Sequence, residues 1–374
     1  MKAIGIILAG GNNNKMRELS QKRAIAAMPV AGSYRSIDFA LSSMTNSRIN
    51  KVAVFTQYNA RSLNEHLSSS KWWDFGRKQG GLYVLTPTIT SDNSFWFRGT
   101  ADAISQNIDF IDTYNPEYVL ILSGDHIYKM DYAAMVAYHE EHNASCTIAV
   151  RTVPIEEASR FGILNTNPDN SIYEFEEKPK KPKSTNASMG IYVFNWSVLR
   201  EALITDEEDP DSSNDFGKNI IPMLLGAGHK MMAYNFDGYW KDVGTIESLW
   251  QANMDLLEDE PPIDTDGKWQ ISSSNLSMPP HYVGKEAKSG MSVEVERIVA
   301  FIKREMSNTN YHREIDGKRI TPVEVSALIL KKVVDDANEQ RSYEGLPPVK
   351  KAVITVPAYF GNMECELTKQ AGKI

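Results

Sequence analysis

Short apolar runs alternate with amphipathic stretches over the first 258 residues. The apolar runs are rich in β-branched residues and bounded by polar residues or glycine, which predicts buried strands at 2–9, 50–56, 116–125, 145–153 and 187–195. The amphipathic stretches predict helices at 36–47, 59–68, 100–113, 131–143 and 215–225. Alternating strands and helices indicate an α/β fold with a mostly parallel sheet, whose ligands collect where strands end.

Two segments depart from this alternation. Residues 205–215, TDEEDPDSSND, carry acids, a proline and serines without periodicity, which favours a solvated loop. Residues 259–290 include two Pro-Pro pairs and many polar residues, which marks a boundary. We therefore predict one domain over 1–258, a linker over 259–290 and a second folded segment over 291–374.

The second segment has a different pattern. A capping box at Thr321 and Glu324, with Pro322 at the first helical position, predicts the start of a long helix. The remaining elements predicted there are a helix at 293–306, a hairpin at 311–320 turning at Asp316-Gly317, a strand at 349–359 and a helix from 365.

Composition excludes several classes of protein. No apolar run approaches the roughly 18 residues that a membrane span needs, and the N-terminus lacks the cleavage pattern of a signal peptide, so we expect a cytoplasmic protein without a membrane partner. The two cysteines, Cys146 and Cys365, indicate neither a disulfide framework nor a zinc site. A net charge of -8 disfavours binding to nucleic acid.

The segment that follows the first strand could bind phosphate. Gly10 and Gly11 stand between a predicted strand and a helix, where backbone N–H groups can point at a phosphate. Asn12, Asn13 and Asn14 tolerate the left-handed conformations that glycine usually supplies. The alternative is a turn with no ligand, which is about as compatible with the pattern.

Two aspartates follow apolar runs. Asp125 ends the run in LILSGD, and Asp242 follows one in GYWKD. Carboxylates at strand ends commonly hold Mg²⁺ against substrate phosphates, and two of them could clamp the metal. The alternative for Asp125 is an ordinary capping or turn aspartate.

A third group lies in EFEEKPKKPKSTNASMG. Glu177 and Lys178 precede a proline, and Ser188 and Gly190 begin the next strand. The lysine could bind a phosphate while the glutamate accepts hydrogen bonds from sugar hydroxyls. The alternative is an ordinary charged hairpin with a solvated tip.

Taken together, nine ordered segments resemble the bacterial glucose-1-phosphate adenylyltransferases, also called ADP-glucose pyrophosphorylases. The resemblance covers residues 1 to about 283 and rests on LAGG, YRSIDFALSSMTNS, FRGTADAISQNIDFI, SGDHIYKMDY, RFGILNT, FEEKP, SMGIYVF, DFGKNIIP and GYWKDVGTIESLWQANM. It implies a Rossmann-like nucleotidyltransferase domain of glycogen biosynthesis, in which glucose 1-phosphate attacks the α-phosphorus of ATP and pyrophosphate leaves.

The resemblance also implies roles for particular residues. Asp125 and Asp242 would hold Mg²⁺, with Asp125 catalytic. Gly162, Glu177, Lys178 and Ser188 would hold glucose 1-phosphate, and Gly10, Gly11, Gly99 and Thr100 would lie near the nucleotide.

Three positions depart from the catalytic pattern of the family. Catalytic members have arginine where this chain has Lys15, lysine where it has Ile25 and tyrosine where it has Phe97. The first two cations would neutralise the departing pyrophosphate, so their loss predicts impaired catalysis. Residues 1 to about 113 resemble the non-catalytic partner subunit of bacterial glycogen synthesis, which acts beside a catalytic homologue.

A second discontinuity lies near Val283. The family continues into a β-helix of hexapeptide repeats, which this chain lacks. Residues from about 284 to 374 instead resemble a partial α/β fragment of the ATPase domain of the seventy-kilodalton heat-shock chaperones, with Pro357 at the switch proline and Cys365 where arginine is usual. Three hypotheses follow: an impaired adenylyltransferase, a non-catalytic partner subunit, or a chimeric reading frame joined near 113 and 283.

Overall fold

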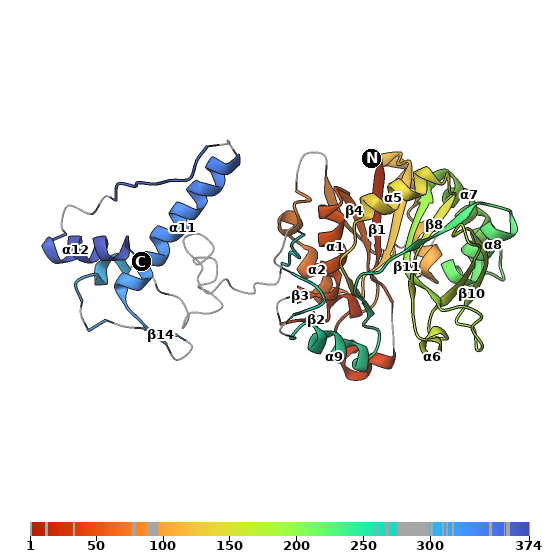
Figure 1. Cartoon of the computed structure of the whole chain (residues 1–374), viewed down its shortest axis with the longest axis horizontal. Helices are drawn as coiled ribbons and strands as arrows, with labels where there is room; N and C mark the ends of the chain where they lie inside the picture. Colours follow the sequence, from red (N-terminus) through yellow and green to blue (C-terminus); the bar gives the residue numbers. More distant parts are fainter. Residues whose placement is uncertain are drawn as a thin grey trace. The chain divides into compact units, whose positions relative to one another are not determined.

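The computed structural model divides into two compact units, Met1–Ser277 and Met278–Ile374, which are described separately (Figure 1). It describes residues 2–11, 14–32, 34–76, 80–88, 96–258, 260–265, 269–274, 299, 302–308, 310–311, 313–315, 318–343, 346–354, 356 and 360–373.

The first unit is built on a mixed sheet to which nine described strands belong. They are β1 (Ala3–Leu8), β4 (Lys51–Phe55), β5 (Gly81–Leu85), β6 (Tyr118–Ser123), β8 (Cys146–Thr152), β9 (Gly162–Thr166), β10 (Ile172–Glu177), β11 (Asn186–Asn195) and β12 (Met231–Asn235). The order β5-β4-β1-β6 is parallel throughout, and β12 is parallel to β8. β11 runs antiparallel to β6, β8 and β9, and β10 is antiparallel to β9.

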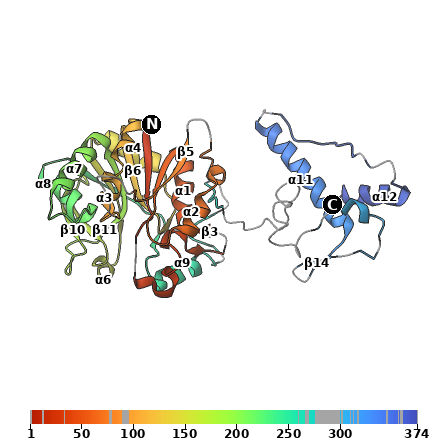
Figure 2. The same cartoon turned by 180° about the vertical axis from the view of Figure 1, so that it is seen from behind.

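Helices cover both faces of this sheet (Figure 2). One face packs against α1 (Ser36–Asn46), α2 (Arg61–Leu67) and α5 (Tyr132–Glu141), and the other against α3 (Thr100–Ser105), α4 (Ile108–Tyr114), α7 (Trp196–Glu208) and α8 (Ile221–Gly226). The strands allow this because successive side chains alternate: Leu120 and Leu122 enter one core, whereas Val119 and Ile121 enter the other. This is the predicted α/β fold.

Shorter elements complete the first unit. They are the 3₁₀ helices η1 (Asn14–Ser20), η2 (Ile25–Ala27) and η3 (Ser70–Trp73), the π-helical turn η4 (Phe216–Ile220), α6 (Ile155–Ala158), α9 (Ile246–Asp255) and the antiparallel pairs β2 (Pro29–Val30) with β3 (Tyr34–Arg35) and β7 (His126–Tyr128) with β13 (Trp240–Asp242). A third apolar core gathers residues of η1, η2, α1 and α9.

The five predicted strands and most of the predicted helices of the first unit are present. The helix predicted at 100–113 is two helices, because the backbone of Asn107 (φ -126°, ψ 21°) interrupts it before α4. The solvated loop predicted at 205–215 is wrong in its first four residues, which belong to α7. That helix was not predicted, and neither were β5, β9, β10 and β12.

Described residues beyond 258 also pack against the first unit. Ile263 and Ile271 are buried in the third core, and the Ser272 N–H donates to Ser42 Oγ at 2.8 Å. The linker expected over 259–290 therefore begins with chain that lies inside the first compact unit, because these two isoleucines need apolar neighbours. Whether the predicted boundaries at 258 and 290 separate domains that fold independently stays a prediction.

The second unit contains the predicted hairpin and the helices predicted to begin near 321 and 365. β14 (Arg313–Ile315) pairs antiparallel with β15 (Lys318–Ile320), and α11 (Pro322–Tyr343) and α12 (Asn362–Ala371) follow, after the 3₁₀ helix η7 (Ile302–Glu305). The capping box is confirmed, since the Thr321 N–H donates to Glu324 Oε2 at 2.7 Å and the Glu324 N–H to Thr321 Oγ1 at 3.4 Å.

The strand predicted at 349–359 is wrong for the residues of this segment that the structure describes. Residues 349–354 and 356 have no strand pairing, and Val353 is 94% exposed. A strand needs a hydrogen-bonded neighbour, and strand propensity alone does not supply one. Pro357, the Asp316-Gly317 turn and most of the helix predicted at 293–306 lie outside the described residues.

Candidate active site

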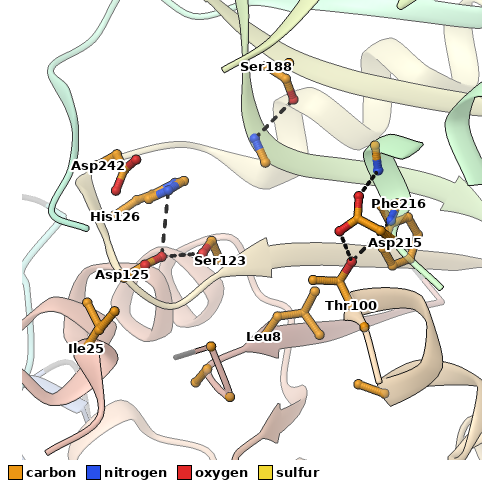
Figure 3. A pocket seen from close by; sticks show the side chains of 18 of the residues that line it. Leu8, Ile25, Thr100, Ser123, Asp125, His126, Ser188, Asp215, Phe216 and Asp242 are labelled. Carbon is orange, nitrogen blue, oxygen red and sulfur yellow. Dashed lines mark hydrogen bonds and ion pairs between the residues drawn. The ribbon is translucent and has the colours of Figure 1, made fainter. Parts of the chain in front are cut away.

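A cavity of about 650 Å³ opens at the carboxyl ends of β1, β4 and β6. Figure 3 shows it from close by, with Leu8 at the end of β1 and Asp125 just beyond β6. The walls come from residues distributed over the first unit, among them Gly10, Gly11, Ile25, Phe97, Gly99, Thr100, Asp125, Gly162, Glu177, Lys178, Ser188 and Asp242. Of the residues selected from the sequence, Lys15 does not line this cavity.

The two selected aspartates lie on the same side of the cavity. β13 pairs with β7 so that Asp242 stands opposite His126, the neighbour of Asp125 (Figure 3). The Ser123 hydroxyl donates to Asp125, and His126 Nε2 lies 3.8 Å from Asp125 Oδ1. Asp242 Oδ1 accepts from the Gly244 N–H at 2.8 Å.

The electrostatics of this pair favour a bound cation. Burial raises the pKa of Asp125, and the negative charge of Asp242 raises it further, although His126 and the Ser123 hydroxyl lower it. Two neighbouring carboxylates suit Mg²⁺, which takes one or two protein carboxylates and completes its shell with phosphates and water. No group of three or more potential metal ligands occurs among the residues that the structure describes.

A second polar group lies around the carboxylate of Glu177. A Cβ added to Gly217 would come within 2.5 Å of Glu177 Oε2, and one added to Gly162 within 3.1 Å of the same atom. An alanine at Gly217 would therefore displace this carboxylate, and one at Gly162 would press on it and on Phe175, whose Cζ would lie 2.5 Å from the added Cβ. Lys178 Nζ forms an ion pair with Glu177.

Backbone geometry directs the neighbouring side chains. Lys178 has φ 48°, an uncommon conformation for a residue with a side chain, and its N–H donates to Phe161 O at 3.1 Å. Gly190 has φ 66° where the pairing of β11 with β8 shifts register, and its N–H donates to Ser188 Oγ at 3.2 Å. This bulge places Ser188 on the cavity wall.

Gly99 and Thr100 form another part of the wall. A Cβ on Gly99 would lie 2.1 Å from Asn214 O, so only glycine fits there. Thr100 Oγ1 donates to Asp215 Oδ2 at 3.3 Å and accepts from the Phe216 N–H at 3.2 Å. Phe97 lines the same region and offers a ring without a hydroxyl.

Two residues that depart from the family pattern, Ile25 and Lys15, lie in different parts of the structure. Ile25 lines the cavity, is 7% exposed and belongs to the third apolar core. Lys15 lies in η1 with an exposed side chain. Asn12 and Asn13, selected for their backbone conformations, lie outside the described residues.

The cavity wall also contains residues that were not selected from the sequence, among them Tyr192, Asp215, Phe216 and Trp240. The rings of Tyr192 and Phe216 stack with centroids 5.7 Å apart. Burial raises the pKa of the Tyr192 hydroxyl. All four residues lie in segments that carried the resemblance. For Asp215 and Phe216, the available signal was their place directly before a glycine in DFGK.

No helix among the described residues has the length and apolar character to cross a membrane.

Comparisons with known proteins divide the chain in two. Residues 4–259 match the family model described as nucleotidyl transferase, and residues 279–374 match the model described as Hsp70 protein. The glucose-1-phosphate adenylyltransferase of Clostridium novyi is 55% identical over 301 residues, which is 80% of this chain and 79% of that protein. The proteins of the same name from Clostridium perfringens (strain SM101) and Desulforamulus reducens are 54% identical (81% of this chain, 79% of that protein) and 52% identical (80% and 75%). By its fold, its cavity and these relatives, the chain belongs to the nucleotidyl transferase family.

Proposed function

We propose that this nucleotidyltransferase acts on ATP and glucose 1-phosphate, as the names of its relatives indicate for them. A phosphate oxygen of glucose 1-phosphate would form a bond to the α-phosphorus of ATP. The bond from that phosphorus to pyrophosphate would break, giving ADP-glucose. The observation that carries the proposal is that one cavity is lined both by the carboxylate pair and by Glu177, Lys178 and Ser188.

Each group of residues has a task in this reaction. Glu177 accepts hydrogen bonds from sugar hydroxyls, while Lys178 and Ser188 bind the phosphate of glucose 1-phosphate. Lys178 is paired with Glu177 in the structure, so the lysine exchanges this partner for the phosphate when the substrate binds. The nucleotide lies against Gly10, Gly11, Gly99 and Thr100.

Asp125 and Asp242 would hold Mg²⁺. When bound, this ion neutralises phosphate charge that the protein alone would leave exposed. Before it binds, the charge of Asp242 and the burial of Asp125 both raise the pKa of Asp125, and a cation between the two carboxylates would offset their repulsion. The Ser123 hydroxyl and the Gly244 N–H orient the two carboxylates through the hydrogen bonds described above.

Catalysis is impaired in this proposal. Ile25 places a hydrocarbon at the cavity wall where catalytic relatives, by the resemblance, have a cation for the departing pyrophosphate. Lys15 lacks the planar fork of arginine, which binds phosphate through two parallel hydrogen bonds. Phe97 removes a hydroxyl from the sugar side.

The position of Ile25 also favours a second candidate. A subunit that binds the substrates of glycogen biosynthesis, without turning them over, could serve a catalytic homologue in a hetero-oligomer in the cytoplasm. Two different family models match residues 4–259 and 279–374, which favours a chimeric origin with a join near 283. Independent sequence reads across residues 113 and 283 from source DNA test that origin.

The experiment for the main proposal measures pyrophosphate release from ATP and glucose 1-phosphate with Mg²⁺, together with binding of each substrate by calorimetry. We expect binding of both, slow release, and loss of the remaining release in Asp125→Asn. Asp211→Asn, in an exposed loop, is the matched control. Binding without any release would favour the partner-subunit candidate, and a chain that binds neither substrate would contradict both.

A further inference from the structure

The segment expected to be a solvated loop contains a buried carboxylate behind the cavity wall. Asp206, in the last turn of α7, is 1% exposed. Its Oδ1 accepts from Ser212 Oγ at 2.6 Å, and its Oδ2 accepts from Asn214 Nδ2 at 3.0 Å. Burying a carboxylate is unfavourable unless it is hydrogen-bonded in this way, so the network needs both partners.

The network fixes an uncommon backbone conformation. Asn214 is 4% exposed and has φ 51°, in the left-handed region that residues with side chains seldom adopt. Its N–H donates to Ser212 Oγ at 2.9 Å, so Ser212 connects the Asn214 backbone to Asp206 while the Asn214 amide contacts Asp206 directly. Asp206 therefore holds Asn214 through two routes.

Asn214 in turn forms the back of the cavity wall. Its carbonyl accepts from the Ala101 N–H at 2.8 Å and lies so close to Gly99 that a Cβ there would be 2.1 Å away. The next residue, Asp215, accepts from Thr100 Oγ1. The position of Gly99 and Thr100 thus depends on the conformation of Asn214.

A second contact from the same turn of α7 reaches the same segment. Glu207 accepts from Arg98 Nη2 at 2.5 Å, and Arg98 Nη2 also donates to Asp102 Oδ1 at 2.8 Å. Residues 98–101 are therefore held on both sides of Gly99: Arg98 is bound to Glu207 of α7, and Ala101 is bound to Asn214, which Asp206 holds. The residues assigned to glucose 1-phosphate do not depend on α7 in this way, because β10 and β11 are held by pairing with other strands of the sheet.

We propose that Asp206 is a positioning residue for the nucleotide. Through Asn214 it sets how far Gly99 and Thr100 project into the cavity, and so it controls the binding of a nucleoside triphosphate more than that of the sugar phosphate. The assignment of Gly99 and Thr100 to the nucleotide rests on the proposed function.

The experiment exchanges the two side chains of the pair. Asp206→Asn leaves one acceptor oxygen where two donors point, so its NH2 group must face either Ser212 Oγ or Asn214 Nδ2, and Asn214→Asp sets two carboxylates against each other. The double variant restores one amide against one carboxylate, and aspartate tolerates the left-handed conformation as asparagine does. Asp211→Asn, in the same segment and exposed, is the matched control.

Two measurements are made on each folded variant: calorimetric affinity for ATP and for glucose 1-phosphate, and hydrogen exchange at the Ala101 amide. We expect each single variant to bind ATP about tenfold more weakly, as the loss of one charged hydrogen bond suggests. In each single variant, the affinity for glucose 1-phosphate should stay within about threefold of that of the unaltered chain. The Ala101 amide exchanges faster in the single variants, and the double variant restores both quantities.

Other outcomes overturn the proposal in distinguishable ways. If the unaltered chain binds ATP and the single variants bind it equally well, the positioning role fails and the proposed function stands. If both ligands weaken together with the melting temperature and the double variant restores neither, Asp206 has a structural role only. If the unaltered chain binds no ATP, the proposed function fails, and the positioning role fails with it even where Ala101 exchange responds.

Discussion

Replacing Ile25 with lysine, together with Lys15→Arg, should raise the rate of pyrophosphate release by a factor of 100 or more. Ile25 lines the cavity, so a lysine there can extend its ammonium group toward a pyrophosphate leaving the site. Removing one donor to a transition-state charge commonly costs about 100-fold to 1000-fold, and a factor of 100 corresponds to about 2.7 kcal/mol in the activation barrier. We expect Ile25→Lys alone to give most of the gain, because Lys15 does not line the cavity.

The same substitution should lower stability. Ile25 is buried in the third apolar core, and burying an isoleucine contributes about 1.5–3 kcal/mol. The aliphatic stem of lysine recovers part of this, because its charged end can reach the cavity. A lower melting temperature is therefore expected, and the variant must be shown to be folded by circular dichroism before its rate is interpreted.

The assay couples pyrophosphate release to a colorimetric phosphate readout at saturating ATP, glucose 1-phosphate and Mg²⁺. Ile25→Met is the matched control, since it is long and flexible but uncharged, and it should leave the rate unchanged. Ordinary family-level activity in the unaltered chain would refute the reasoning. So would an equal gain in Ile25→Met, whereas no gain in a folded double variant would move the defect away from this loop.

Three further predictions test other parts of the structure. Gly217→Ala puts a Cβ 2.5 Å from Glu177 Oε2, so calorimetry should show glucose 1-phosphate bound about tenfold more weakly, whereas Gly226→Ala, with open space around it, should not change binding. Burial lowers the pKa of His139, so the unfolded chain takes up more protons than the folded chain as pH falls through about 6.5, and stability should fall there. Melting temperatures at pH 8 and 5.5 should differ less in His139→Gln, and an unchanged difference would count against this cause. Ile271→Ala should cost about 2–5 kcal/mol in the free energy of unfolding of the first unit by urea denaturation, and no change would place this segment outside its core.

The sequence predicted those parts of the fold that depend on local pattern. The run that became β6 is apolar on both faces, so its burial and the position of Asp125 beyond its end could both be predicted. Its partner Asp242 is less accessible to such reasoning, because β7 and β13 have three residues each and show no detectable periodicity. The pattern of apolar runs and the resemblance both suggested a shared site for the two carboxylates, but neither predicted the pairing of β7 with β13 that sets Asp242 opposite His126.

Other features depend on contacts that no local pattern encodes. The apolar run of β11 predicts a buried strand but not the direction of its neighbours. Its antiparallel pairing with β6 could therefore not be predicted. The acids of 205–215 resemble a solvated surface, yet Asp206 is buried because Ser212 and Asn214 supply its hydrogen bonds. Conversely, residues 349–354 have strand propensity but no strand partner among the described residues.

In the proposed function, substrate binding and reaction rate depend on different parts of this chain. Glu177, Lys178 and Ser188 come from β10, β11 and the turn between them, which the sheet holds in place. By the resemblance, the cations that would meet pyrophosphate belong to positions in η1 and η2, between β1 and α1, where this chain has Lys15 and Ile25. Substitutions in that segment leave the sheet pairing intact, so binding can survive there while turnover is lost. Only contacts that strengthen in the transition state accelerate a reaction. In the proposed function, Ile25 lacks one such contact, while Glu177, Lys178 and Ser188 remain in the cavity wall to bind the substrate.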